Sequence, residues 1–499
     1  MNINDFDKIK NGSYIGKKGY TISKSILSDN ELNFLKNDLF MKPFVPVKKF
    51  DAPDSFPVYR ENSSKIYIPR FYGINRYGLP NTSQISPGLN INLKFAKELR
   101  EYQKNIVSIY INYVNSPISN DSNIFGNGAI LEVPCGRGKT VMALNIISIL
   151  SKKTLIIVHK EFLLNQWIER INEFLPGAKI GKIQADVYDV KDKDIVIGML
   201  QTLYIKSFEQ DSFSEFGLTI IDEVHRIGSE QFSKALLKCV TPYMLGISAT
   251  VERKDKLTNL LYMFIGDRIY KEDKRDDDQV TVRSINFINN DDDFNNVEYD
   301  FRGSVKYSTM ISKLCNFNPR SELIIKVTSN LIHNDNQKQI MILAHNKSLL
   351  NYLHQRISLL NFASVGFYIG GMKAKDLTDT ESKQIVLATY AMAAEALDIK
   401  TLSTLIMASP KTDITQSIGR ILRIKGNNPI VIDVIDPHEP FQKQWIQRKR
   451  YYKKNNYFVY NIDSTKFTDI NNSPWNISFD PNKKTNDNKD KKPKCLIDL

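Results

Sequence analysis

The chain has 499 residues and a formal net charge of +13, which leaves room for about two or three domains and suits a polyanionic partner. No apolar stretch approaches the roughly 18 residues of a membrane-spanning helix, and residues 1–5 lack the regions of a signal peptide, so a membrane protein and a secreted protein are both disfavoured. The four cysteines lie far apart, without the paired spacing of a zinc site or a disulfide framework, which favours a reducing, cytoplasmic compartment.

Residues 1–95 are expected to form an N-terminal extension. Within it, the segment 65–77 interleaves basic residues with aromatic ones. Such a segment can hold a nucleic-acid strand, but it can equally pack the extension against the next domain, and we favour packing.

Residues 96–270 alternate short apolar strands with helical stretches, a pattern typical of a parallel sheet with helices on both faces. Strands are expected at 129–133, 154–158, 195–198, 219–221 and 244–247. Ligands of such a sheet bind beyond the carboxyl ends of its strands.

The segment 133–140 reads Val-Pro-Cys-Gly-Arg-Gly-Lys-Thr and lies between the first of these strands and an apolar helical stretch, 141–150. A glycine-rich turn in this position presents backbone N–H groups to phosphates, while Lys139 adds a cation and Thr140 a hydroxyl for magnesium. The generic pattern expects a glycine where this chain has Val133. The flanking strand and helix therefore carry the prediction of a triphosphate site.

Asp222 and Glu223 follow the apolar strand at 219–221, and His225 comes two residues later. Two adjacent carboxylates at a strand end are unfavourable unless a cation neutralises them. One can complete a magnesium site while the other positions the attacking water. Together with the glycine-rich turn, the pair predicts ATP hydrolysis.

The chain turns polar between about 271 and 305, which we interpret as a linker. A second α/β unit is expected over 306–460, followed by a disordered basic tail over 461–499. Strands of the second unit are expected at 340–344, 384–388, 404–408 and 430–434. A helical stripe of Phe441, Gln444, Arg448, Tyr451 and Tyr452 fits a core face as well as a nucleic-acid contact.

Further short segments follow the acidic pair in chain order: 246–250, 253–255, 388–390, 395–399 and 416–423. With the glycine-rich turn and 222–225, they resemble the motif set of superfamily 2 helicases from about residue 99 to 454. The forms of 134–136, 248–255 and 416–423 are similar to the branch that holds the poxvirus transcript-release DNA helicase and the DNA-opening subunit of TFIIH. The resemblance implies two tandem RecA-like P-loop lobes after an N-terminal extension, with ATP and Mg²⁺ as cofactors.

The resemblance also implies a role for individual residues. Lys139, Glu223, Arg420 and Arg423 would be catalytic, the two arginines as fingers that stabilise charge on the departing phosphate. The nucleotide would be held by Gln103, Pro134, Cys135, Gly136, Arg137, Gly138, Lys139, Thr140, Asp222 and Asp398, with Gln103 reading the adenine and with Thr140 and Asp222 as magnesium ligands. His225, Ser248, Thr250 and Gln416 would couple hydrolysis to lobe movement. His159, Lys160, Gln201, Thr202 and Thr389 would contact the nucleic-acid backbone.

Two further positions within the matched segments are not assigned these roles. Trp167 lies near the strand-contacting segment, but we assign it to the core. Ala396 stands where the family carries a glycine, which bears on coupling more than on hydrolysis.

These expectations predict a nucleic-acid-dependent ATPase, a DNA translocase or helicase that acts in viral-type transcription. An RNA helicase is the nearest alternative, because the motor motifs read sugar-phosphate backbone. A scaffold with a vestigial ATPase is disfavoured, because the catalytic residues are intact. Abundant Asn, Ile and Lys fit an AT-rich genome and, with the resemblance, favour a large DNA virus. DNA or RNA, and transcription machinery, are the expected partners of a chain that can act as a monomer in the cytoplasm, a viral factory or a virion.

Overall fold

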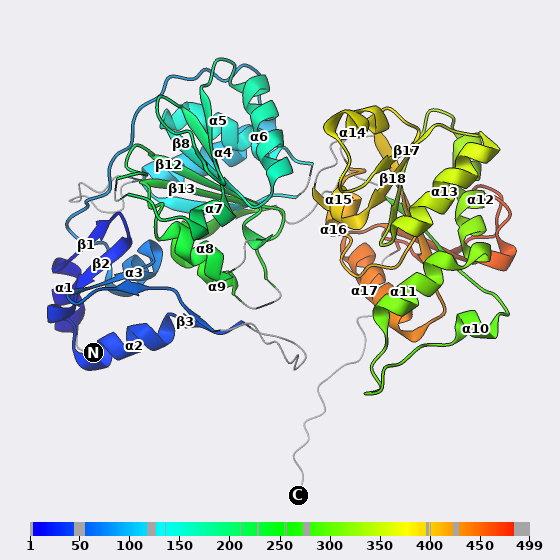
Figure 1. Ribbon diagram of the computed structural model, residues 1–499, viewed down its shortest axis with the longest axis horizontal. Helices are drawn as coiled ribbons and strands as arrows, with labels where there is room; N and C mark the ends of the chain where they lie inside the picture. Colours follow the sequence, from blue (N-terminus) through cyan, green and yellow to red (C-terminus); the bar gives the residue numbers. More distant parts are fainter. Residues whose placement is uncertain are drawn as a thin grey trace, which may run out of the picture. The chain divides into compact units, whose positions relative to one another are not determined.

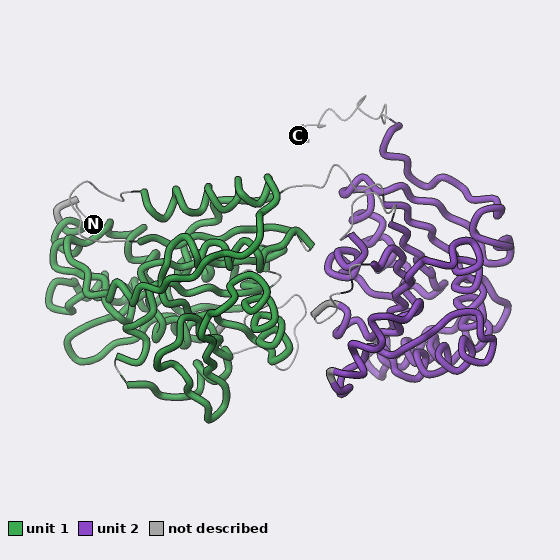
Figure 2. The backbone as a smooth tube through the Cα atoms, turned by 90° about the horizontal axis from the view of Figure 1, so that it is seen from above, with its two compact units in different colours: residues 1–273 green, residues 274–499 purple. Residues whose placement is uncertain are grey.

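The computed structural model describes residues 3–43, 55–116, 126–134, 136–209, 211–226, 229–253, 255, 257–272, 280–395, 399, 401–422 and 429–483. The chain forms two compact units, residues 1–273 and 274–499 (Figure 2). Each unit is built around an eight-stranded, mostly parallel sheet (Figure 1).

A small antiparallel sheet begins the first unit, with strand order β1-β2-β6-β5. Its residues alternate, so that Ile15, Ile22, Ile66 and Ile68 are buried against the neighbouring helices. The elements are α1 (Ile3–Asn11), β1 (Ser13–Gly16), β2 (Gly19–Ser23), η1 (Lys24–Ile26), α2 (Asp29–Asp38), β3 (Phe40–Met41), β4 (Phe56–Pro57), β5 (Arg60–Glu61), β6 (Lys65–Ile68) and α3 (Arg70–Tyr77).

Arg70 fastens this N-terminal segment to the rest of the first unit. Its buried guanidinium donates hydrogen bonds to the carbonyls of Thr241, Pro242 and Gly126, at 3.0, 2.8 and 2.8 Å. Phe71 packs beside it in the core of the unit. For this part of the segment 65–77, the structure therefore agrees with packing.

The large sheet of the first unit has the order β10-β9-β11-β8-β12-β13-β7-β14. Neighbouring residues of β8 enter different hydrophobic clusters: Leu155 and Ile157 face one, Ile156 and Val158 the other. Helices therefore cover both faces, as predicted, and each predicted strand is present. The elements are α4 (Glu101–Asn115), β7 (Gly128–Glu132), α5 (Lys139–Leu150), β8 (Thr154–Val158), α6 (Glu161–Phe174), β9 (Ile180–Gln184), β10 (Val187–Tyr188), β11 (Ile195–Met199), α7 (Leu200–Ile205), β12 (Leu218–Asp222), η2 (Val224–Arg226), α8 (Ser229–Leu236), β13 (Tyr243–Ser248), α9 (Thr258–Ile265) and β14 (Asp267–Lys271).

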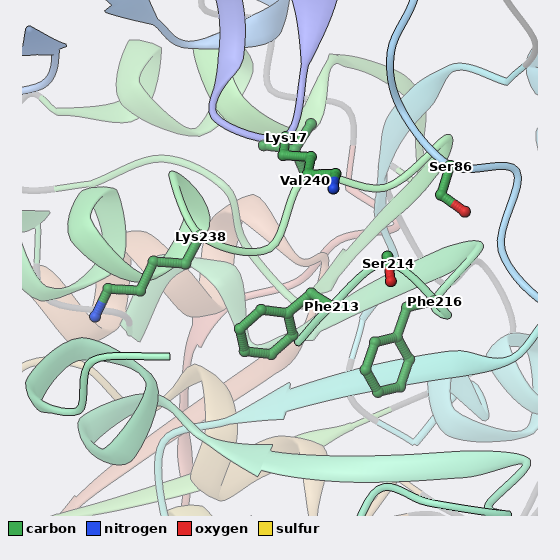
Figure 3. A pocket seen from close by; sticks show the side chains of 7 residues that line it. All are labelled: Lys17, Ser86, Phe213, Ser214, Phe216, Lys238 and Val240. Atoms are coloured by element: carbon green, nitrogen blue, oxygen red, sulfur yellow. The ribbon is translucent and has the colours of Figure 1, made fainter. Parts of the chain in front are cut away.

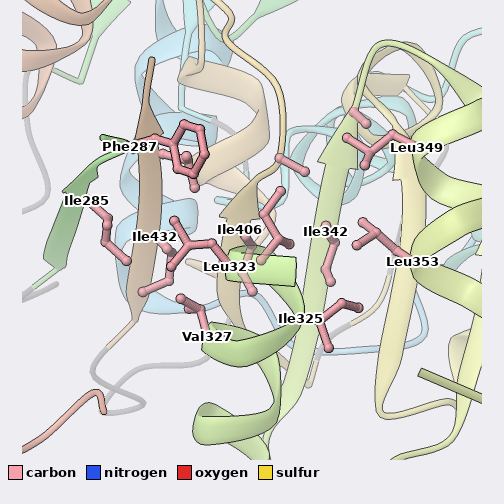
Figure 4. Close-up of a cluster of buried hydrophobic side chains, with 14 of the residues drawn as sticks. Ile285, Phe287, Leu323, Ile325, Val327, Ile342, Leu349, Leu353, Ile406 and Ile432 are labelled. Atoms are coloured by element: carbon pink, nitrogen blue, oxygen red, sulfur yellow. The ribbon is translucent and has the colours of Figure 1, made fainter. Parts of the chain in front are cut away.

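The sheet of the second unit has the order β17-β18-β16-β19-β20-β15-β21-β22. Its core gathers aliphatic side chains from the strands and from the helices that cover them, among them Ile342, Leu353 and Ile406 (Figure 4). The elements are β15 (Thr281–Asn286), α10 (Asp292–Asn295), α11 (Tyr307–Asn316), α12 (Asn318–Asn334), β16 (Gln339–Ala344), α13 (Lys347–Leu360), β17 (Val365–Tyr368), α14 (Ala374–Glu381), β18 (Ile385–Thr389), α15 (Tyr390–Glu395), β19 (Leu402–Met407), α16 (Thr415–Gly419), β20 (Ile430–Ile435), α17 (Glu439–Lys454), β21 (Phe458–Asp463), η3 (Ser464–Lys466) and β22 (Asn476–Phe479).

Two predicted boundaries are wrong. The expected linker 271–305 contains β15, which pairs with β20 and β21 inside the second sheet. The expected disordered tail 461–499 contains the end of β21 and β22, and Phe467 and Ile470 are buried in the second core. In both segments a few apolar residues among many Asn and Asp suffice to anchor the chain.

Three residues of the helical stripe on α17, namely Phe441, Arg448 and Tyr452, are buried in the core, whereas Gln444 and Tyr451 are half-buried. Arg448 and Asp433 form a buried bidentate ion pair at 2.8 and 2.9 Å, and the hydroxyl of Tyr452 donates to Asp433 at 2.9 Å. These contacts fix α17 on β20. Phe441, Arg448 and Tyr452 are therefore too deeply buried to contact a nucleic acid at the surface.

Candidate active site

The glycine-rich turn after β7 has the backbone that a phosphate loop requires. Gly136 and Gly138 have φ angles of +77° and +78°, and α5 begins immediately afterwards at Lys139. A Cβ atom at Gly138 would lie 2.4 Å from Nε2 of Gln103. Glycine is therefore needed at position 138 for its conformation and for space, and the first N–H groups of α5 face the loop. Pro134 precedes this turn, and Cys135 lies outside the described residues.

Gln103 supports the loop from the side. Its buried amide donates from Nε2 to the carbonyl of Arg137 at 3.1 Å, and its Oε1 accepts from the N–H of Arg100 at 3.0 Å. The guanidinium of Arg137 lies 3.7 Å from the ring centroid of Tyr102 and pairs with Glu272 at 2.5 Å. The loop thus has a preformed support. The adenine contact expected of Gln103 stays a prediction.

The acidic pair at the end of β12 lies beside the lysine of the loop. Lys139 Nζ is 3.8 Å from Glu223 Oε1, and both side chains are largely buried. Glu223 itself has a φ of +50°, a left-handed conformation that is costly for a residue other than glycine. Strain of this kind is concentrated at functional sites, where the surrounding structure holds it in place.

Asp222 is buried, and its carboxylate accepts a hydrogen bond from Trp167. The indole Nε1 donates to Asp222 Oδ2 at 2.9 Å. Burial, and next the negative charge of Glu223, raise the pKa of Asp222 to about 6, although the bond from Trp167 acts in the other direction. A divalent cation would reverse this shift, because it favours the ionised carboxylate. The carboxylate of Asp222 and the hydroxyl of Thr140, which lies at the start of α5, are oxygen donors of the kind that Mg²⁺ prefers, and their pairing at a metal ion stays a prediction.

Three of the four predicted coupling residues connect Glu223 to the end of β13. His225 Nδ1 lies 3.3 Å from Glu223 Oε2 and 2.7 Å from Ser248 Oγ. Ser248 in turn donates to the carbonyl of Thr250 at 2.5 Å. Arg253 completes the arrangement by donating to the carbonyl of His225 at 3.0 Å. These contacts join Glu223 to residues 248–253, and the coupling role of these residues stays a prediction.

The predicted nucleic-acid contacts of the first unit lie at the carboxyl ends of two paired strands, β8 and β11. His159 and Lys160 follow β8, and Gln201 Nε2 donates to the carbonyl of His159 at 2.8 Å. Thr202 is buried, and its hydroxyl accepts from the N–H of Ala185 at 3.0 Å. Thr202 therefore has a structural bond that the sequence did not indicate.

The remaining predicted residues belong to the second unit. Thr389 ends β18, Gln416 lies in α16, and the half-buried Arg420 follows that helix directly. Asp398 and Arg423 lie outside the described residues, as does Ala396.

Trp167 is the site residue that was missed. It lies in the core, as predicted, but its indole also donates a hydrogen bond to Asp222. An apolar helix position gave no signal for a partner 55 residues away.

No cluster of three or more His, Cys, Asp or Glu side chains able to hold a metal ion occurs in the part of the chain that the structure describes. Within that same part, no helix has the length and apolarity of a membrane span.

Comparison with known proteins gives consistent matches. The family model of the type III restriction enzyme res subunit matches residues 96–253. A protein of Acanthamoeba polyphaga mimivirus, named "Putative ATP-dependent RNA helicase", is 32% identical over 460 residues, which cover 89% of this chain and 86% of that protein. The "DNA 3'-5' translocase XPB2" of Sulfurisphaera tokodaii is 30% identical over 211 residues, 41% of this chain and 43% of that protein.

Solved structures agree on the fold. A variant of S. cerevisiae Dbp5 bound to RNA and ADP BeF3 superposes with a TM-score of 0.51 at 11% identity, over 74% of this chain and 90% of that one. At this identity the likeness concerns the fold alone, which is that of tandem RecA-like lobes.

Proposed function

Because the chain belongs to the superfamily 2 helicases, we propose that it is a DNA-dependent ATPase that translocates along or opens duplex DNA during viral-type transcription, including transcript release. As a helicase it is an ATP-hydrolysing enzyme that acts on nucleic acid. The dependence on DNA and the place in transcription are the steps that we add.

One observation carries the hydrolytic part of the proposal: Lys139, Glu223, His225 and Ser248 form a continuous chain of contacts from the phosphate loop to the end of β13. Lys139 would contact the β- and γ-phosphates, and Glu223 would orient the attacking water. Thr140 and Asp222 would hold Mg²⁺, which supplies positive charge against the phosphates when bound. His225 and Ser248 would transmit a displacement of Glu223 on hydrolysis to the part of the unit that contacts the nucleic acid.

The second unit would complete the reaction. Arg420, and with it Arg423, would act as arginine fingers on the departing phosphate, as the form of the segment 416–423 implies. These arginines and the phosphate loop belong to different units. Hydrolysis would therefore be converted into movement of one unit relative to the other.

The choice of DNA rests on the motif forms at 134–136 and 248–255 and on the match to a DNA translocase. RNA is the second candidate, because the mimivirus relative that matches most of the chain is named for RNA. Since the relatives include viral proteins, we place the activity in a viral transcription setting in the cytoplasm.

ATP hydrolysis should be measured with no polymer, single-stranded DNA, duplex DNA and RNA, beside a Glu223→Gln variant. The proposal expects strong stimulation by DNA that the variant loses. Stimulation by RNA alone would replace the DNA motor with an RNA helicase. Equal rates with and without every polymer would contradict both candidates.

A further inference from the structure

A cleft of about 790 Å³ separates the N-terminal sheet from the part of the first unit that follows α7 and α8. None of the residues predicted to bind ATP or nucleic acid is among the described residues that line it. A narrower recess continues from it, with Lys17 of the β1–β2 turn on one side and Phe213 and Phe216 on the other (Figure 3). A cavity of this volume has room for a ligand of nucleotide size.

One wall of the cleft is a row of side chains across the small sheet. Tyr14 pairs with Thr21, Thr21 with Tyr67, and Tyr67 with Arg60, so the four residues occupy one line across four strands. All four line the cleft, while Ile15 on the opposite face is buried in the core. From the spacing of neighbouring strands, Tyr14 and Tyr67 lie roughly 10 Å apart, which leaves room for one base on each ring.

Cations flank both tyrosines. Lys65 Nζ lies 5.2 Å from the ring centroid of Tyr14, and Lys18 Nζ lies 4.9 Å from that of Tyr67. Lys18 is exposed, so a phosphate can reach it. A base can stack on the face of each tyrosine ring, while a nearby ammonium group can hold the phosphate of the same nucleotide.

The opposite wall adds aromatic and basic groups. Phe208 and Phe213 lie there beside Lys238, which donates to three carbonyls at the end of α7. Burial, and next the positive charge of Arg60, lower the pKa of Lys238. Among the described residues of the lining there is one acid, Glu209, and there are four cations, although Asp211 already pairs with Lys17. An anion in the cleft would relieve this crowding of positive charge.

We propose that this cleft binds a single-stranded segment of the nucleic acid on which the motor acts, with bases stacked on Tyr14 and Tyr67 and phosphates held by Lys18 and Arg60. This inference rests on the proposed function, because it takes the polymer to be a nucleic acid. It adds a second contact site that lies outside the helicase motifs. Stacking and backbone charge carry no base preference, so the site serves any sequence.

The test compares two double variants, Tyr14→Ala/Tyr67→Ala and Tyr14→Phe/Tyr67→Phe. Binding of a fluorescent single-stranded oligonucleotide is measured by anisotropy without nucleotide. Loss of the rings should weaken binding about 5- to 150-fold per stacked base, whereas the phenylalanine pair should bind like wild type. Phe40→Ala, at an exposed aromatic of β3 outside the cleft, is the matched control and should change nothing.

Two further measurements secure the result. Lys18→Ala should reduce the slope of log affinity against log salt by about 0.7–1, as expected for one lost phosphate contact. Ultraviolet cross-linking of the wild-type protein to a strand with photoreactive bases should give adducts on Tyr14 or Tyr67. Because it uses the native chain, this measurement remains decisive even where the alanine pair fails to fold. Adducts confined to other segments would overturn the proposal.

The two proposals can fail separately. Wild-type protein that neither binds a polymer nor is stimulated by one would contradict the proposed function. Wild-type protein that is stimulated by DNA, with the alanine pair binding as tightly as wild type, would contradict the cleft alone. Polymer-free ATPase activity should be the same in all the cleft variants, because their residues lie outside the phosphate site.

Discussion

Replacing Trp167 with phenylalanine removes the indole donor 2.9 Å from Asp222 while keeping a large buried ring. A hydrogen bond to a charged group contributes about 1.5–3 kcal/mol, which corresponds to about one to two pKa units. The pKa of Asp222 is already raised to about 6 by burial and by Glu223, and the loss of a bond that lowers it would raise it further. The carboxyl would then take up a proton at a higher pH.

Protons and Mg²⁺ compete for this carboxylate, so the change should appear in the metal dependence of ATP hydrolysis. We expect the Mg²⁺ concentration for half-maximal activity to rise about two- to tenfold in Trp167→Phe at pH 7, because a pKa raised by about one to two units leaves only about a half to a tenth of the carboxyl ionised at that pH. In the wild type the same concentration should rise only as the pH falls toward 6, because protonation begins there. The assay is steady-state ATPase across a magnesium series at several pH values.

Trp475→Phe is the matched control, because its indole also donates one hydrogen bond, at 3.1 Å to the carbonyl of Ile470, but in the second unit. It should leave the magnesium dependence unchanged. An unchanged magnesium dependence in Trp167→Phe, or the same shift in both variants, would refute the assignment of Trp167 as a positioning residue for the metal site.

Three other substitutions give sharp expectations. Gly138→Ala should weaken ATP binding about 5- to 150-fold in a nucleotide-affinity measurement, since alanine is strained at a φ of +78° and its Cβ would lie 2.4 Å from the amide of Gln103; wild-type affinity would show that the loop tolerates a side chain. Asp222→Asn should stabilise the metal-free protein above pH 6 by on the order of 1–3 kcal/mol in chemical unfolding, because a raised carboxyl pKa costs stability once the group ionises; a stability loss would contradict the burial penalty. Arg420→Ala should lower the ATPase rate by about 10³-fold or more while ATP still binds, whereas the exposed Arg450→Ala should not; equal rates would remove Arg420 from the reaction.

The sequence was most informative where a local pattern determines the structure. Short apolar runs followed by helical stretches predicted the central strands, such as β8 and β12, because buried parallel strands need continuous apolar residues. The glycine-rich turn before α5 was predictable for a similar reason, since its glycines and Lys139 are adjacent in the chain.

Features that depend on distant contacts were not predictable. The strand β15 lies in a polar segment and is held by pairing with β20 and β21, far away in sequence. The bond between Trp167 and Asp222 likewise joins two elements through tertiary packing. The cleft beside Tyr14 arises only when the small sheet and the region after α7 come together.

The central claim is that ATP hydrolysis at the phosphate loop drives movement along DNA. Displacement of a third strand from a DNA triplex tests it most directly, because it reports translocation whether or not the duplex is opened. We predict displacement that requires ATP and Mg²⁺ and that disappears in Glu223→Gln. Displacement that is absent while DNA stimulates hydrolysis, or that proceeds equally in Glu223→Gln, would contradict the account.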